Sequence, residues 1–176
     1  VSAAESRVTD SSCTNTGTAE PASDDVVPDA NQYKYQKDEL AAFCHFGPNT
    51  FNEIEWGEHY GDKKPSEIFR LNQKFDAETM VSTLKSAGFK KLIITAKHHD
   101  GFCIWPSEYT DYDAAAAGYK GDILEEISTA CTKHGMDMGL YLSPWDIHEP
   151  SYGYKDANGN PTTPDKDVKD YNEYYN

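Results

Sequence analysis

Two adjacent histidines, His98 and His99, stand at the end of an apolar run in the stretch LIITAKHHDGF. Imidazoles can donate or accept hydrogen bonds, so a pair at the mouth of a strand suits the hydroxyl groups of a sugar. The alternative is a structural pair, in which one ring binds a backbone carbonyl and the other lies at a rim. Metal ligation is the weaker interpretation, because adjacent side chains diverge and no spaced His-x-His pattern is present.

Similar side chains recur in two other segments, HFGPNTFNEIEWGEHYG and YLSPWDIHEP. A carboxylate accepts hydrogen bonds from hydroxyls, and an indole covers the apolar face of a sugar ring. Each residue could instead be a packing residue or a solvated charge, but their recurrence in three loops favours one polar and aromatic site. The candidates in these two segments are His45, Glu55, Trp56, Tyr141, Trp145 and Asp146.

Two amphipathic helices precede two of the three loops. Apolar residues recur with helical spacing between Asp76, which is placed to cap the first helix, and Gly88, which ends it. Asp122 and Glu125 form a capping box for the second helix, which stops at Gly135. Each helix therefore leads into an apolar run that reads as a strand.

The helix and strand pattern predicts an α/β fold with parallel strands. The strands are expected in ELAAFCHFG, as a short buried strand ending at His45, and in KKLIITA and MDMGLYL. Loops that follow parallel strands meet at the carboxyl edge of the sheet, where α/β proteins assemble their sites. No GxGxxG or GxxxxGK[ST] motif is present, which favours a barrel over a nucleotide-binding sheet.

The barrel is expected to be incomplete in this chain, because an eightfold barrel takes about 250 residues and only three strands are convincing here. Residues 1–30 read as a flexible tail or interdomain linker, and residues 31–176 as the N-terminal half of a catalytic (β/α) TIM-like barrel whose last segment, DVKDYNEYYN, opens another helix. Such a sheet leaves edges and apolar faces exposed, so the remainder of the barrel is an expected partner, in the same or a second chain.

Composition narrows the choice of partners. The 176 residues carry 16 Lys+Arg and 30 Asp+Glu, a formal net charge of -14, and no clustered basic stripe, so nucleic acid is not expected. No apolar run approaches the length of a membrane span, and no signal peptide is recognisable near Val1. Cys44, Cys103 and Cys131 are expected to be small buried residues.

Several segments resemble the catalytic domain of family 29 glycoside hydrolases, the α-L-fucosidases. They are AFCHFGPNTF, EWG, AGFKKLIITAKHHDGFCIWPSEYTDY and GDILEEISTACTKHGMDMGLYLSPWDIHEPSYG. The resemblance implies a retaining exo-hydrolase that is secreted or at the cell surface. No cofactor and no metal are expected. The YLSPWD loop is similar to the branch that releases α-1,3/1,4-linked fucose from Lewis-type glycans, so the implied partners are fucosylated oligosaccharides or glycoprotein glycans.

The resemblance also implies roles for individual residues. His45, Glu55, Trp56, His98 and His99 match positions that hold fucose, Tyr141 is a further match in that site, and Trp145 and Asp146 match rim positions near the leaving sugar. The nucleophilic Asp and the acid/base Glu of the family come after the part that is matched. The carboxylates present here are not substitutes for them: Glu55, Asp100, Asp146 and Glu149. Two alternatives remain, a fucose-binding fragment without hydrolysis and a metal-dependent barrel hydrolase that uses His45, His98, His99 and Asp146.

Overall fold

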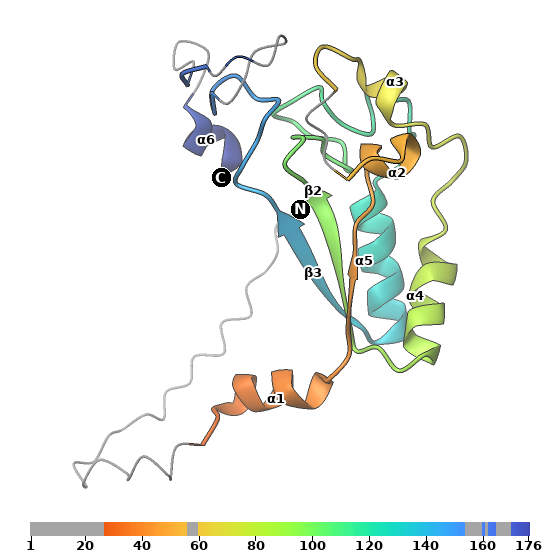
Figure 1. Ribbon diagram of the computed structural model, residues 1–176. Coiled ribbons are helices and arrows are strands. Elements are labelled where there is room, and N and C mark those ends of the chain that lie inside the picture. Colours follow the sequence, from red (N-terminus) through yellow and green to blue (C-terminus); the bar gives the residue numbers. More distant parts are fainter. Residues whose placement is uncertain (1–26, 56–59, 154–159, 161, 165–169) are drawn as a thin grey trace, which may run out of the picture. The chain divides into compact units, whose positions relative to one another are not determined.

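The computed structural model describes residues 27–55, 60–153, 160, 162–164 and 170–176 (Figure 1). The chain divides into two units, residues 1–36 and Lys37–Asn176. The described residues of the first unit include most of helix α1 (Ala30–Asp38), which has no buried residue. Most of the expected tail, residues 1–26, lies outside the described residues.

A parallel three-stranded sheet forms the centre of the second unit. Its strands are β1 (Ala41–Cys44), β2 (Lys91–Lys97) and β3 (Asp137–Leu142), in the order β1-β2-β3. Both pairings are parallel, as the sequence predicts, with Phe43 opposite Ile93 and Ile93 opposite Gly139. All three carboxyl ends therefore point the same way.

Two helices cover one face of this sheet. Figure 1 shows α4 (Ala77–Ser86) and α5 (Ile123–His134) side by side on the same side of the strands. Each starts where the sequence predicts, because the Asp76 carboxylate accepts from the Thr79 N–H and the Asp122 carboxylate accepts from two backbone N–H groups. The helices bury an apolar core against the middle strand; its fully buried members include Val81, Leu92, Ile94, Ile123 and Ile127.

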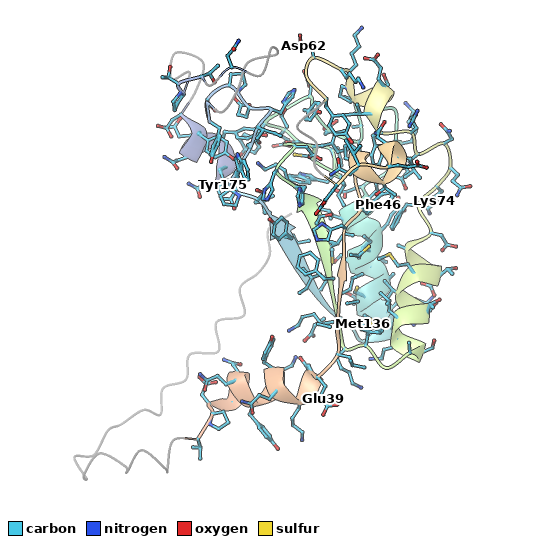
Figure 2. The ribbon with its side chains drawn as sticks, in the orientation of Figure 1. Glu39, Phe46, Asp62, Lys74, Met136 and Tyr175 are labelled. Carbon is cyan, nitrogen blue, oxygen red and sulfur yellow. The ribbon has the colours of Figure 1, made fainter. Side chains whose placement is uncertain are left out.

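Two short helices and the last helix lie near the carboxyl ends of the strands. They are α2 (Pro48–Asn52), α3 (Pro65–Ile68) and α6 (Tyr171–Tyr175). Both α2 and α3 begin with proline, whose fixed φ suits the first turn of a helix. The expected helix in DVKDYNEYYN corresponds to α6. In Figure 2 Phe46 marks the end of β1 that carries these helices, and Met136 marks the opposite end of the sheet.

The prediction that the first strand is buried is wrong for this chain. The Phe43 side chain in β1 is 51% exposed, and Leu140 in β3 is 57% exposed. Both strands are edges of a three-stranded sheet, and among the described elements only β2 has a neighbour on each side. The middle strand is buried as predicted, with five of its seven residues inaccessible to solvent.

The described cysteines are unbridged. Cys103 and Cys131 are buried, as expected, whereas Cys44 is half-buried because it lies in edge strand β1. In the part of the chain that the structure describes, no helix has the length and apolar character needed to cross a membrane.

Candidate functional site

The carboxyl ends of the three strands bring a group of rings together. The ring centroids of His45 and His98 are 5.3 Å apart, and those of His98 and His99 are 4.4 Å apart. From β3, Tyr141 stacks on His98 at 5.7 Å, and Trp145 packs on His99 at 4.7 Å. Segments separated by about fifty residues in sequence thus meet at one edge of the sheet.

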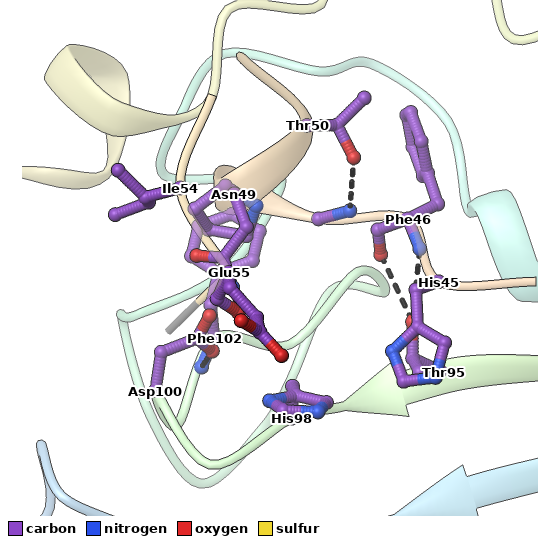
Figure 3. Close-up of a pocket in the computed structure, with 12 residues that line it drawn as sticks. His45, Phe46, Asn49, Thr50, Ile54, Glu55, Thr95, His98, Asp100 and Phe102 are labelled. Atoms are coloured by element: carbon purple, nitrogen blue, oxygen red, sulfur yellow. Dashed lines mark hydrogen bonds between the residues drawn. The ribbon is translucent and has the colours of Figure 1, made fainter. Parts of the chain in front are cut away.

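A cavity of about 460 Å³ is lined by two of these rings, His45 and His98 (Figure 3). This volume lies within the range of small-molecule sites, and the walls combine aromatic surface with a few polar groups. In Figure 3 the Glu55 side chain extends toward the His98 ring. The lining residues include His45, Phe46, Asn49, Glu55, His98 and Asp100.

Thr95 ties the first loop to the middle strand. Its hydroxyl accepts a hydrogen bond from the Phe46 N–H at 3.0 Å and donates to the Phe46 carbonyl at 3.2 Å. Thr95 is buried, so this pair of bonds is protected from water. The consequence is that His45, the residue before Phe46, is held next to His98.

The loop that carries Glu55 is held by an amide network. The Asn49 side-chain amide donates to the Glu55 carbonyl at 2.8 Å, and the Tyr60 hydroxyl donates to the Asn49 side-chain oxygen at 2.8 Å. Asn52 donates to the carbonyls of Pro48 and Ile68. Glu55 is exposed and lines the cavity. Trp56, the other candidate in this loop, lies outside the described residues.

Burial and neighbouring positive charge favour the neutral form of His98 and His99. Desolvation lowers the pKa of His98 to about 4, with His99 and His45 acting in the same direction. Desolvation, together with Lys97 and His45, also lowers the pKa of His99. A neutral imidazole has one donor and one acceptor nitrogen, so each ring can donate or accept a hydrogen bond, depending on its tautomer and its other contacts.

Asp146 is not placed as a rim residue. It is fully buried, and its carboxylate accepts from the Lys97 ammonium at 2.8 Å and from the backbone N–H groups of His148 and Glu149. Lys97 is itself buried and is also bonded to the Tyr171 hydroxyl at 3.3 Å. Asp146 is therefore buried behind the site, where its carboxylate holds the Lys97 ammonium and the backbone of residues 148 and 149, and it is not exposed at the rim.

The metal interpretation does not fit this arrangement. Asp146, the only carboxylate in its proposed ligand set, has both oxygens committed to Lys97 and to backbone donors. Among the described residues, no group of three His, Cys, Asp or Glu side chains is placed to hold an ion.

Known proteins share the sequence and the fold of much of this chain. The alpha-L-fucosidase family model matches residues 49–176. This chain belongs to the alpha-L-fucosidase family. It covers only the N-terminal part of the family's domain.

Individual fucosidases extend the match to most of the chain. Alpha-L-fucosidase 1 of Arabidopsis thaliana is 42% identical over 152 residues, which is 85% of this chain and 27% of the plant protein. A GH29 fucosidase of Ruminococcus gnavus, solved in complex with fucose, is 76% identical with a TM-score of 0.77, over 91% of this chain and 33% of that one. A putative alpha-L-fucosidase of Bacteroides ovatus is 45% identical with a TM-score of 0.65, over 73% and 22% of the two chains. The chain thus spans about a third or less of the fucosidases it matches.

Sequence reasoning missed three residues that organise this candidate site, namely Thr95, Lys97 and Ser143. Thr95 and Lys97 are polar residues at the carboxyl end of a strand whose residues 92–94 and 96 are apolar. Polar residues within such an apolar run were a usable signal. Ser143 carried no comparable signal, because its role depends on contacts with His99 that only the folded chain makes.

Proposed function

We propose that this chain supplies the fucose-binding subsite of a retaining exo-α-L-fucosidase. The observation that carries the proposal is the convergence of His45, His98 and Tyr141 from three parallel strands beside a cavity that Glu55 also lines. Family membership supplies the chemistry of the ligand. The R. gnavus relative, which shares three quarters of its aligned residues with this chain, was solved with fucose bound.

The residues of the site suit a small deoxy sugar. The histidine rings provide hydrogen-bond donors and acceptors for ring hydroxyls, and the Glu55 carboxylate accepts from hydroxyls. The rings of Tyr141 and Trp145, with Trp56 by resemblance, offer apolar surface for the C–H face and the methyl group of fucose. The Trp145 ring packs on the His99 ring, and we assign Trp145 to the rim near the leaving sugar.

The reaction we propose is a two-step displacement. A carboxylate attacks the anomeric carbon, while a carboxylic acid first protonates the leaving oxygen and then activates water as a base. We assign both groups to segments outside this chain. The residues described here bind and orient the sugar, which can lower a barrier by several kcal/mol but does not replace the nucleophile.

The substrates we propose are fucosylated oligosaccharides and glycoprotein glycans with terminal α-1,3/1,4-linked fucose of the Lewis type, and we place the protein outside the cell or at its surface. Similarity of the YLSPWD loop supports the linkage. One relative, 28% identical over 67% of this chain, is the plasma alpha-L-fucosidase of Homo sapiens, which supports an extracellular location. Fucose release from Lewis-type trisaccharides should exceed release from α-1,2-linked substrates in kcat/KM.

The test uses the complete protein that carries this chain, assayed for fucose release from a Lewis-type trisaccharide. We expect His99→Ala and Trp56→Ala each to lower kcat/KM by at least about tenfold, or about 1.4 kcal/mol of transition-state stabilisation. His134→Ala is the matched control, because His134 pairs with Glu78 on the helical side of the sheet and contacts no residue of the cavity. It should leave kcat/KM unchanged.

Two results would contradict the proposal in different ways. No fucose release by the complete protein, with L-fucose still bound, would favour the fucose-binding fragment over the enzyme. Fucose release that neither substitution lowers would leave the activity standing and overturn the site assignment.

A further inference from the structure

Ser143 makes three polar contacts with its hydroxyl in the loop after β3. Its Oγ lies 2.6 Å from Nδ1 of His99, 2.7 Å from the Trp145 carbonyl and 3.1 Å from the Trp145 N–H. Ser143 is completely buried, so water does not compete for these contacts. The hydroxyl is therefore a fixed part of the structure beside His99.

The three contacts together determine where the protons are. The backbone N–H of Trp145 can only donate, and the Trp145 carbonyl can only accept. The single Ser143 hydroxyl proton must therefore go to the carbonyl, because otherwise two oxygens would face each other at 2.7 Å without a proton between them. The contact to His99 then needs a proton on Nδ1 of the imidazole.

The backbone around this serine is tied to the histidine strand. The Ser143 N–H donates to the Lys97 carbonyl, and the Ile147 N–H donates to the His99 carbonyl, both at 2.9 Å. The Lys97 and Asp146 side chains add a buried ion pair between the same two segments. These ties limit the freedom of the loop to move Ser143 away from His99.

We infer that Ser143 is a positioning residue, which holds neutral His99 with its proton on Nδ1 and so makes Nε2 a hydrogen-bond acceptor. The inference rests on the proposed function for its ligand, since Nε2 then accepts a hydrogen bond from a hydroxyl of fucose. His99 thus contributes an acceptor of fixed direction to the site, and the same hydroxyl holds the backbone of Trp145, whose ring packs on His99.

The direct test is neutron diffraction from deuterium-exchanged crystals of the complete protein near neutral pH. We expect deuterium on Nδ1 of His99, none on Nε2, and the Ser143 deuterium directed at the Trp145 carbonyl. Deuterium on Nε2, alone or together with Nδ1, would overturn the assignment. This result does not depend on hydrolysis or on any sugar, so it stands even if the proposed function fails.

A binding experiment tests whether the arrangement serves the sugar. In the complete protein, Ser143→Ala should weaken L-fucose binding by about fivefold, the effect of one misdirected hydrogen bond. In a His99→Ala background the same change should alter the L-fucose Kd by less than about twofold, because Ser143 acts through His99. A Ser143→Ala effect that is undiminished in that background would show a purely structural role and refute the inference.

Ser86→Ala is the matched control, since this serine is exposed on α4 and its hydroxyl donates to the Thr83 carbonyl of its own helix. It should leave L-fucose affinity unchanged in both backgrounds. If the wild-type protein binds no L-fucose, the proposed function is wrong, and the neutron result alone then decides the protonation of His99.

Discussion

Asp100 follows the histidine pair and places a buried carboxyl group beside the cavity. It is 3% exposed, and its oxygen accepts from the Phe102 N–H at 2.9 Å. Desolvation, followed by repulsion from Asp146, raises its pKa from 3.8 to about 6 despite the opposing effects of Phe102 and Lys97. The neighbouring His98 is shifted in the other direction, to a pKa of about 4.

These two shifts have opposite effects on stability between about pH 4 and pH 6. Folded Asp100 binds a proton more readily than unfolded Asp100, so its contribution to the free energy of unfolding rises as pH falls through about 6. Folded His98 binds a proton less readily, so its contribution falls as pH drops below about 6.5. In the native chain the two contributions partly offset each other.

Asp100→Asn should remove this offset. The amide oxygen can still accept from Phe102, but the group no longer titrates, so of these two contributions only that of His98 remains. We expect the free energy of unfolding of the variant to fall more than that of the wild type between about pH 7 and pH 4.5, measured by urea titration. Asp111→Asn, at an exposed carboxylate, is the control. Parallel pH profiles for Asp100→Asn and the wild type would contradict the assignment.

At the scale of elements, the turn after β2 depends on a glycine that lies against Asp146. Gly101 has φ +78, and a Cβ atom there would lie 2.4 Å from the Asp146 carboxylate. A side chain at this position would meet both the strain of a left-handed backbone and the carboxylate that pairs with Lys97.

Gly101→Ala should therefore destabilise the chain more than Gly88→Ala does. Gly88 also has a positive φ, of +94, but a Cβ there would meet nothing within 4 Å, so its substitution isolates the backbone effect of about 1–2 kcal/mol. We expect Gly101→Ala to lower the free energy of unfolding by at least about 2 kcal/mol more than Gly88→Ala, measured by urea denaturation. Equal effects of the two substitutions would show that Asp146 is not held rigidly.

Local signals explain which elements could be predicted from the sequence. Asp76 and Asp122 cap helices through bonds to residues two or three positions away, so the pattern was visible in the sequence. The burial of Asp146 depends on its ion pair with Lys97, 49 residues earlier, and no residue near Asp146 in sequence indicates that partner. The exposure of Phe43 was missed for a similar reason. It depends on which elements pack beside strand β1, and the residues near Phe43 in sequence do not show this.

At the scale of the whole molecule, the sheet presents apolar side chains that the described helices leave uncovered. Phe43, Leu140 and Leu142 are 51%, 57% and 37% exposed, and they belong to the two edge strands. Exposed strand edges with large apolar residues favour association with further chain. We propose that the remainder of a barrel, in the same or a second chain, covers them.

Leu140→Glu tests this proposal in the complete protein. If Leu140 is covered there, a buried glutamate without a partner should lower the free energy of unfolding by about 3 kcal/mol or more, because it loses apolar burial and gains an unpaired charge. Val27→Glu is the control, since Val27 is 80% exposed and lies in the first unit. It should change stability by less than about 0.5 kcal/mol. Urea denaturation curves in which both variants match the wild type would mean that Leu140 faces solvent in the complete protein, and that no barrel strand or helix packs over β3 at this position.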